Sequence, residues 1–316
     1  MPRFDVTIAG ELNLDLLLYG LPQTLPPERE VLADRMVLTL GSSSAILAHN
    51  LATLGGRVGL QSRIGADPLG QIALERLAQA GVDVSRVRRV AGSTQSGLTV
   101  ILQHQASRNI LTYPGTIAEL QISDLDFDYL CDARHFHLSS FYLQTALRPK
   151  VPVLFQRLKR AGLTISLDTN DDPADEWQGG LRDALPYVDV MFPNAREACR
   201  IAGTSDLNAA VRQLAELVPL LVVKLGGEGA MALRGKERFD QPAVRVAAVD
   251  PVGAGDSFDA GFLYQYLRGA DIPTCLAYGN LAGALSTTRP GGTEAFREQA
   301  HRERFFHDHL AEMPTR

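Results

Sequence analysis

Hydrophobic residues recur along this chain in two alternating patterns. Short apolar runs, such as FDVTIAG at 4–10 and VGLQSRIG at 58–65, have the length and composition of β-strands. Between them, apolar positions spaced three and four residues apart predict helices. The segment 42–56 begins with serines suited to an N-cap and ends with two glycines, and the segment 67–81 has proline early and glycine at its end. Strands that alternate with helices predict a mostly parallel sheet with helices on both faces.

The alternation continues through the second half of the chain. A helix over about 149–161 is followed by strands at GLTISLDTN and VDVMFPN and by a helix that starts at Asn194. PLLVVKLGGEGAMAL predicts two short strands, and VRVAAVD (244–250) predicts a strand that leads into a glycine loop. Because the sequence contains no linker, repeat or low-complexity tract, residues 1–316 are expected to form one α/β domain.

Two segments, at about 10–41 and 95–115, carry more strand and turn signals than helix signals. Within the second segment, SGLTVILQHQ and RNILTYPG predict the two strands of a hairpin. We expect the two segments to form a small β-sheet that projects from the main body.

The composition narrows the classes of partner. The chain has 316 residues, a net charge of −5 and a pI of about 5.8, which argues against nucleic acid because phosphate backbones attract basic surfaces. The basic run SRVRRV at 85–90 is expected to be a solvated face. Three separated cysteines, Cys131, Cys199 and Cys275, predict neither a disulfide framework nor a zinc site and are compatible with a reducing cytoplasm. Acidic residues interrupt the N-terminal apolar stretches, so neither a signal peptide nor a membrane span is expected.

The sequence DPVGAGDSFDAGFL (250–263) places three nearly bare peptide units before an apolar helix. Gly253, Ala254 and Gly255 have little or no side chain, so their amides can approach an anion, and the helix dipole adds partial positive charge. Asp256 then has two interpretations: it stabilises the helix N-terminus, or it acts as a base on a group bound beside the anion. The loop is not a P-loop, which needs GxxxxGK[ST], and it lacks the third glycine of a dinucleotide-binding GxGxxG.

This loop resembles the C-terminal signature of the ribokinase-like carbohydrate kinases, the PfkB family. GSSSAILAHNLATLGGRVGLQSRIGADPLG (41–70) is similar to the N-terminal signature, and the likeness extends from GELNLD at 10–15 to TRPGG at 288–292. The resemblance implies a three-layer α/β/α sandwich with a mostly parallel central sheet and a small β-sheet lid. It also implies ATP-dependent phosphorylation of a hydroxyl, with Asp256 as general base and the amides of 253–256 as an anion hole.

The resemblance implies further roles on the nucleotide side. Asn194 and Glu197 match an N-x-x-E motif that would organise Mg²⁺ and its waters, although the same spacing is also a helix capping box. VVKLGGEGA would lie beside the adenine and ribose, although this sequence is also typical of a tight hairpin turn. The segment 278–292 would form a second wall, although its small residues are also typical of a closely packed helix. The implied ATP-binding residues are Asn194, Lys224, Gly226, Gly229 and Asn280.

Some members of the family hold a monovalent cation beside the anion hole. By the resemblance, K⁺ would be bound here by Asp250 and by backbone carbonyl groups of Val252, Ser286, Arg289 and Gly291. Asp250 is equally expected as a turn residue at the end of a strand.

On the acceptor side, GELNLDL matches the opening motif of the family. Asp15 interrupts an apolar run, which is costly unless its side chain has a partner. The chain departs from the family pattern where Ser42 replaces a glycine and Ile46 replaces the asparagine that contacts the sugar, so Ser43 or Ser44 is expected to compensate. Arg108, on the lid hairpin, is either an acceptor contact or a solvated arginine. The implied acceptor-binding residues are Asp15, Asn13, Gly41, Ser42, Ser43 and Arg108.

We therefore predict a carbohydrate kinase that uses ATP and Mg²⁺, with K⁺ as an optional cofactor. Its acceptor would be a small sugar or sugar acid of the fructose, ribose or 2-keto-3-deoxygluconate type. The lid would exclude water from the site. The lids of relatives often pair, which implies a homodimer, and the cysteine pattern favours a cytoplasmic location. Two alternatives stay open: a nucleoside or phosphosugar kinase on the same fold, and a non-catalytic nucleotide-binding sensor. A phosphosugar would need arginines or lysines near Asp15, and the nearby sequence offers few.

Overall fold

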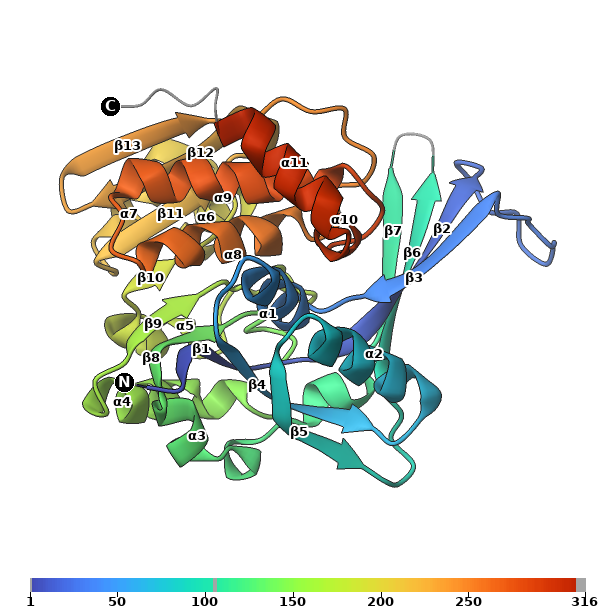
Figure 1. Ribbon diagram of the computed structural model, residues 1–316, viewed down its shortest axis with the longest axis horizontal. Helices are drawn as coiled ribbons and strands as arrows, with labels where there is room; N and C mark the ends of the chain where they lie inside the picture. Colours follow the sequence, from blue (N-terminus) through green and yellow to red (C-terminus); the bar gives the residue numbers. More distant parts are fainter. Residues whose placement is uncertain (1, 105–106, 311–316) are drawn as a thin grey trace.

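The computed structural model describes residues 2–104 and 107–310 and contains a large and a small β-sheet (Figure 1). Within these residues, the large sheet has nine strands in the order β13-β12-β11-β10-β9-β8-β1-β4-β5. In chain order they are β1 (Phe4–Ala9), β4 (Val58–Gly65), β5 (Asp83–Val90), β8 (Ala133–Leu138), β9 (Thr164–Leu167), β10 (Val190–Met191), β11 (Leu220–Lys224), β12 (Gly229–Arg234) and β13 (Glu237–Pro242).

In the spatial order of the large sheet, the seven strands β11, β10, β9, β8, β1, β4 and β5 run parallel to one another. The β11–β12 and β12–β13 pairs are antiparallel. The carboxyl ends of parallel strands lie along one edge of a sheet, where α/β proteins bind ligands. Glu11 follows β1, Asp168 follows β9, Asn194 follows β10 and Lys224 ends β11, so the topology brings these polar side chains to one edge.

Helices cover both faces of the large sheet (Figure 1). In chain order they are α1 (Ser43–Thr53), α2 (Pro68–Gln79), α3 (Phe127–Cys131), α4 (Val151–Arg160), α5 (Leu181–Ala184), α6 (Ala195–Ala202), α7 (Leu207–Ala215), α8 (Ala254–Tyr266), α9 (Ile272–Thr287), α10 (Glu294–Arg297) and α11 (Gln299–Leu310). Of the helices in the described part of the chain, none combines the length and the apolar character needed to cross a bilayer.

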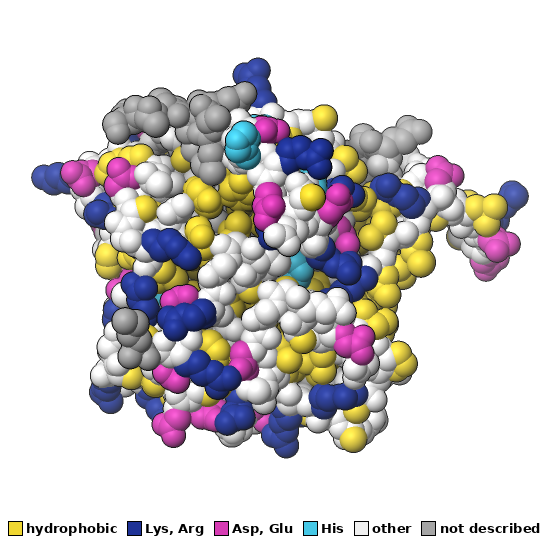
Figure 2. Space-filling model, in the orientation of Figure 1, with side chains coloured by type: hydrophobic (Ala, Val, Ile, Leu, Met, Phe, Trp, Pro, Cys, Tyr) yellow, Lys and Arg dark blue, Asp and Glu magenta, His cyan; other side chains and the backbone are white. Residues whose placement is uncertain are grey.

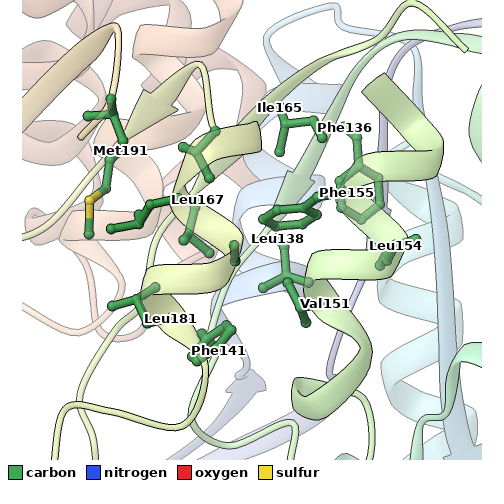
Figure 3. Close-up of a cluster of buried hydrophobic side chains, with 14 of the residues drawn as sticks. Phe136, Leu138, Phe141, Val151, Leu154, Phe155, Ile165, Leu167, Leu181 and Met191 are labelled. Carbon is green, nitrogen blue, oxygen red and sulfur yellow. The ribbon is translucent and has the colours of Figure 1, made fainter. Parts of the chain in front are cut away.

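Each face of the sheet packs into its own hydrophobic core, because successive side chains of a strand point to opposite faces. In β11, Val222 belongs to the cluster that includes residues of α1, α8 and α9, whereas Val223 belongs to the cluster formed with α4 to α7. Figure 3 shows part of the second cluster, in which Phe136 of β8 lies beside Ile165 of β9 and Phe155 of α4. Strands buried on both faces explain why these segments read as continuous apolar runs.

The small sheet, called the lid sheet below, projects from the large domain (Figure 1). Its strand order is β3-β2-β6-β7, with β2 (Asn13–Leu21), β3 (Arg35–Leu40), β6 (Gly97–His104) and β7 (Arg108–Tyr113). The expected lid segment 95–115 includes residues 105–106, which lie outside the described residues. Strand register places Asp15, Leu17 and Tyr19 on the inner face, which meets the large domain, and Leu16 and Leu18 on the outer face.

The outer face of the lid sheet is apolar and partly exposed. Met36 is 63% exposed and Tyr113 is 51% exposed, and both lie in register with leucines of the neighbouring strands. Figure 2 shows hydrophobic side chains along this projecting sheet. Such a surface is larger than the scattered apolar residues of a typical monomer and is usual at protein interfaces.

The structure confirms the mostly parallel sheet between helical layers, but one sequence prediction was wrong. VRVAAVD (244–250) is not a strand: the chain leaves the sheet after β13, and Val244 and Val246 pack against α9 and the C-terminal helices. SRVRRV (85–90) forms most of the edge strand β5, and its arginines are exposed, as expected of a solvated face. Its arginines pair with acids, as in the contacts of Arg86 with Asp126.

Candidate active site

Asp256 lies in the first turn of α8, at the carboxyl edge of the large sheet. Gly253 caps this helix with a φ of 72°, a left-handed conformation that favours glycine. Asp256 is only 8% exposed, and its carboxylate accepts a hydrogen bond from Ser43. Burial, followed by the nearby charge of Asp168, raises the pKa of Asp256 to about 6. The carboxylate is therefore a stronger base than an exposed aspartate and is still ionised at neutral pH.

The backbone before Asp256 has the form of an anion hole. Helices leave their first amides without intrahelical partners, and the dipole makes this end positive. The Ala254 amide donates to the Pro251 carbonyl oxygen at 3.3 Å, so the amides of Gly255 and Asp256 are the better placed donors for a phosphate. A Cβ atom on Gly253 would lie 2.5 Å from the Cα atom of Gly292, so this loop admits no side chain there.

Lys224 brings a buried cation to the same loop. Its Nζ atom lies 2.5 Å from Asp168 Oδ2 and 3.4 Å from Asp259 Oδ1. A Cβ atom placed on Gly255 would lie 3.4 Å from this nitrogen. Burial alone would lower the pKa of Lys224, but Asp168 and Asp259 outweigh it and raise the pKa above its usual value. The ammonium group therefore stays charged beside the first turn of α8.

Asn194 and Glu197 form the capping box that their spacing allows. Asn194 Oδ1 accepts from the Glu197 amide at 2.9 Å, and the Asn194 amide donates to Glu197 Oε2 at 2.8 Å. Burial, then the charge of Asp168, raises the pKa of Glu197 to about 7. An acid held in this way would be stabilised in its ionised form by a cation, so capping and a role near Mg²⁺ are compatible.

A cavity of about 550 Å³ opens beside the first turn of α8. One side is formed by Gly226 and Gly229 in the turn between β11 and β12, and another by residues 243–248 and by α9. Asn280 of α9 lines the cavity, and its Nδ2 atom donates to the carbonyl oxygens of Gln241 and Pro242 at 3.0 Å. The cavity thus runs from the backbone walls expected for a base and ribose to Lys224 and Gly255 at the phosphate end.

Asp15 approaches from the lid sheet. It is 5% exposed, and its carboxylate accepts from Asn13 at 3.4 Å and from Thr99 of β6. Burial, then the charge of Asp256, raises the pKa of Asp15 to about 7. A Cβ atom on Gly41 would lie 1.9 Å from Asp15 Oδ1, so a side chain there would displace the Asp15 carboxylate. Asp15 and Asp256 therefore act on each other across the space between lid and large domain.

The serines at the start of α1 have partners within the protein. Ser42 adopts a positive φ of 68°, caps α1 through the Ala45 amide and donates to the Glu11 carbonyl oxygen, so its hydroxyl is already used. Ser43 contacts Asp256. Ile46 is buried, and its Cδ1 atom would lie 2.6 Å from a Cβ atom on Gly292. The Ile46 side chain thus packs against the backbone at Gly253 and Gly292.

Arg108 is not brought to Asp15. In the strand register Asp15 is opposite Thr99, whereas Arg108 is opposite Gln103, four residues further along β6. At about 3.3 Å per residue this is a separation of about 13 Å along the sheet. Arg108 is exposed, which favours the solvated-arginine interpretation.

The carboxylate of Asp250, a candidate K⁺ ligand, has hydrogen-bond partners within the protein. Its oxygens accept from the amides of Val252 and Gly291, both at 3.0 Å, and from the Tyr19 hydroxyl at 2.9 Å. Gln103 Nε2 approaches the carboxylate at 3.5 Å. Three close donors thus stabilise the Asp250 carboxylate, and its role at a K⁺ site stays a prediction. The carbonyl groups of Val252, Ser286, Arg289 and Gly291 stay candidate ligands by resemblance only.

Comparison with known proteins decides the family. The sequence pattern described as pfkB family carbohydrate kinase matches residues 4–299. The chain belongs to this family. It is therefore an ATP-dependent phosphotransferase that acts on a hydroxyl group, and the predicted ribokinase-like fold and enzyme class are confirmed.

Relatives of this kinase act on different acceptors. It is 32% identical to a fructokinase of Klebsiella pneumoniae over 306 residues, which cover 92% of this chain and 95% of that enzyme. It is 29% identical to a cytidine kinase of Thermococcus kodakarensis, over 87% of this chain and 93% of that enzyme. A ribokinase structure from Thermotoga maritima superposes with a TM-score of 0.80 at 24% identity, covering 96% of this chain and 99% of that one. These matches leave the acceptor of this kinase open.

Sequence reasoning missed several residues of the site. Asp259 and Asp168 hold Lys224, Thr99 supports Asp15, and Tyr19 contacts Asp250. One signal was available: Asp259 lies three residues after Asp256 in an otherwise apolar helix, and a buried carboxylate needs a partner. The partner itself was not predictable, because Lys224 lies on a distant strand.

Proposed function

We propose that this kinase transfers the γ-phosphoryl group of ATP to a hydroxyl of a small, uncharged sugar. The observation that carries the proposal is the pair of buried carboxylates, Asp15 from the lid sheet and Asp256 from α8, which lie close enough for the charge of Asp256 to raise the pKa of Asp15. Asp15 and Asn13 would hold acceptor hydroxyls from the lid side. Asp256 would hold the hydroxyl that reacts, next to the amides of Gly255 and Asp256.

In the proposed reaction, the acceptor oxygen attacks the γ-phosphorus atom while its proton moves to the Asp256 carboxylate. The bond between the γ-phosphorus and the bridging oxygen breaks, and ADP leaves. Charge develops on the phosphoryl oxygens, where the α8 amides and the Lys224 ammonium group would stabilise it. The lid would exclude water, which competes with the acceptor for the phosphoryl group.

We assign Mg²⁺ to the acidic side of the nucleotide site. Glu197 and Asp168 are buried acids within mutual electrostatic influence, and they would hold the water shell of the ion. When bound, the ion would neutralise phosphate charge and orient the phosphate chain. Asn194 would keep the Glu197 carboxylate in place through the capping box.

An uncharged acceptor is favoured over a sugar acid or phosphosugar by the charges around Asp15. The ionisable groups that shift its pKa are carboxylates, Asp256 and Asp250. The lid arginines lie elsewhere: Arg35 is opposite Tyr19, with its guanidinium 4.2 Å from the centre of that ring, and Arg108 is opposite Gln103. An acceptor anion about 5 Å from one buried carboxylate would be disfavoured by about 3 kcal/mol at an effective dielectric constant of 20.

The test is acceptor-dependent release of ADP from ATP and Mg²⁺. The panel pairs neutral acceptors with anionic ones: fructose with 2-keto-3-deoxygluconate, ribose with ribose 1-phosphate, and cytidine with its monophosphate. We expect the neutral sugars to have kcat/KM values about 100-fold higher or more than their anionic partners. A cytidine signal above both sugars would instead establish a nucleoside kinase.

Asp256→Asn tests the base in the same assay. It should lower acceptor-dependent turnover by about 10²- to 10⁴-fold while ATP still binds. Asp308→Asn, a change of an exposed acid on the last helix, is the control and should not alter turnover. Undiminished turnover by Asp256→Asn would remove the proposed base, and ATP binding without turnover for any acceptor would favour a nucleotide sensor.

We also propose that the lid sheets of two copies pair through their apolar outer faces. Met36, Leu111 and Tyr113 are exposed on this face, which supports an interface. Leu111→Lys should convert a dimer to a monomer in light-scattering measurements, whereas an unchanged mass would contradict this interface.

A further inference from the structure

The lid sheet and the glycine loop meet at Asp250. The Tyr19 hydroxyl, at the far end of β2, donates to Asp250 Oδ2 at 2.9 Å, although the two residues are 231 positions apart in sequence. Gln103 of β6 approaches Asp250 Oδ1 at 3.5 Å. Asp250 is almost completely buried, so these lid side chains complete the hydrogen bonding of an internal carboxylate.

Asp250 in turn fixes the two backbone segments that flank the anion hole. Oδ1 accepts from the Val252 amide, and Oδ2 accepts from the Gly291 amide, each at 3.0 Å. The segments continue into Gly253 and Gly292, and a Cβ atom on Gly253 would lie 2.5 Å from the Cα atom of Gly292, so the two segments pack closely. The amides proposed to bind phosphate begin within three residues of Val252, so a shift of Asp250 would move them.

The same lid strands hold the glycine loop by apolar contact. Val252 packs with Leu17 of β2 and Ile101 of β6, and Tyr19 and Val37 lie against this group. The loop is thus bound to the lid on both sides of Pro251, by hydrogen bonds at Asp250 and by packing at Val252.

One strand carries both the acceptor contact and the loop contact. Asp15, Leu17 and Tyr19 alternate along β2 and point to the inner face of the lid sheet. Burial and then the charge of Asp250 raise the pKa of Tyr19 well above its usual value, so its hydroxyl stays protonated and donates. A shift of β2 on acceptor binding would therefore reach Asp250 directly.

We propose that Tyr19 is a positioning residue that couples closure of the lid over the acceptor to the geometry of the anion hole. It acts through Asp250, whose carboxylate places the amides of Val252 and Gly291. The phosphate-binding amides are then correctly placed only when the lid is closed, which restricts phosphoryl transfer to the acceptor-bound enzyme. The coupling rests on the proposed kinase function, but the contact itself can be tested without turnover.

The turnover test compares Tyr19→Phe with Tyr113→Phe, which removes a hydroxyl from an exposed tyrosine of the same sheet. Tyr19→Phe should lower kcat by about tenfold or more, because small misplacements of reacting groups are costly, while the Kd of a non-hydrolysable ATP analogue changes by less than about twofold. Val252→Ala, which loosens the apolar half of the contact, should show the same split between kcat and nucleotide binding. Tyr113→Phe should leave both quantities unchanged.

Hydrogen–deuterium exchange supplies a readout that does not need an acceptor. Amides of 252–257 should exchange faster in Tyr19→Phe than in the wild-type protein, and Tyr113→Phe should not differ from wild type. If exchange in this segment is the same in all three proteins, the coupling is wrong. If exchange rises but kcat is unchanged, or only the acceptor KM changes, the positioning role is wrong. A wild-type protein without any acceptor-dependent turnover would contradict the kinase proposal, and exchange alone would then decide whether Tyr19 orders the loop.

Discussion

The proposed nucleotide side and the proposed acceptor side of this kinase are lined by different kinds of residue. The proposed nucleotide side is a cavity of about 550 Å³ that is lined largely by glycines and alanines, such as Gly226 and Gly229, together with larger side chains such as Phe258. The proposed acceptor side lies between the lid sheet and the large sheet and contains the buried carboxylates of Asp15 and Asp256. A backbone surface can bind the same nucleotide in many relatives, whereas a few side chains decide which acceptor is held.

Lys224 lies at the border of these two regions, and its loss should have the largest effect. Lys224→Met would leave Asp168 and Asp259 buried without their cation, which should cost about 3–5 kcal/mol in the free energy of unfolding. Lys159→Met removes a second lysine–aspartate pair, with Asp189, and is the matched control. The Lys159 side chain is 34% exposed against 11% for Lys224, so the control should cost at most about 1 kcal/mol.

Urea unfolding of both variants, with ADP release measured in parallel, checks this difference. Because protonated acids need no cation, the cost of Lys224→Met should shrink as the pH falls from 8 to 5. Equal costs in unfolding free energy for the two lysines would contradict a stabilising role of the buried contacts of Lys224 with Asp168 and Asp259 between the two sides.

The sequence predicted the nucleotide side better than the acceptor side for a physical reason. Glycine-rich loops and helix starts are local features, so 250–263 and Asn194–Glu197 were recognisable before the structure was known. The contacts of Asp15 with Thr99 and of Asp256 with Ser43 join distant segments and leave no local trace. The error at 244–250 has a similar origin, because alternating valines that pack on α9 look the same in sequence as a strand.

A matched pair of glycine substitutions sharpens the comparison. In Gly41→Ala, the new Cβ atom would lie 1.9 Å from Asp15 Oδ1 and would displace the acceptor-binding carboxylate. In Gly226→Ala, no atom lies within 4 Å, and only the positive φ of 59° is unfavourable, by about 1 kcal/mol. Steady-state kinetics should show an acceptor KM raised about tenfold or more in Gly41→Ala with little change in the KM for ATP.

Gly226→Ala should change the KM for ATP by less than about tenfold and leave the acceptor KM as it is, because about 1 kcal/mol corresponds to a factor of five. If Gly41→Ala raised the KM for ATP instead, Asp15 would belong to the nucleotide side and the assignment of the two regions would be reversed.

The smallest expected effect concerns pH, and it sets activity against stability on the acceptor side. Asp256 has a pKa of about 6 and must be ionised to accept a proton, so kcat/KM should rise between pH 5 and 7.

The pKa of Asp15 is raised from 3.8 to about 7 in the folded protein. A raised carboxyl pKa means that the folded state binds the proton more tightly than the unfolded state. The contribution of Asp15 to the free energy of unfolding is therefore greatest below pH 3.8 and is lost as the pH rises through 7. Between pH 5 and 8, Asp15 should therefore contribute a loss of about 2 kcal/mol in the free energy of unfolding.

Asp15→Asn should remove that loss, so the difference between its unfolding free energies at pH 5 and 8 should be smaller than that of the wild-type protein. Its turnover should still rise between pH 5 and 7, because that rise belongs to Asp256. An unchanged pH dependence of stability in Asp15→Asn would show that Asp15 is hydrated and exposed, and that the acceptor side is as open as the nucleotide side.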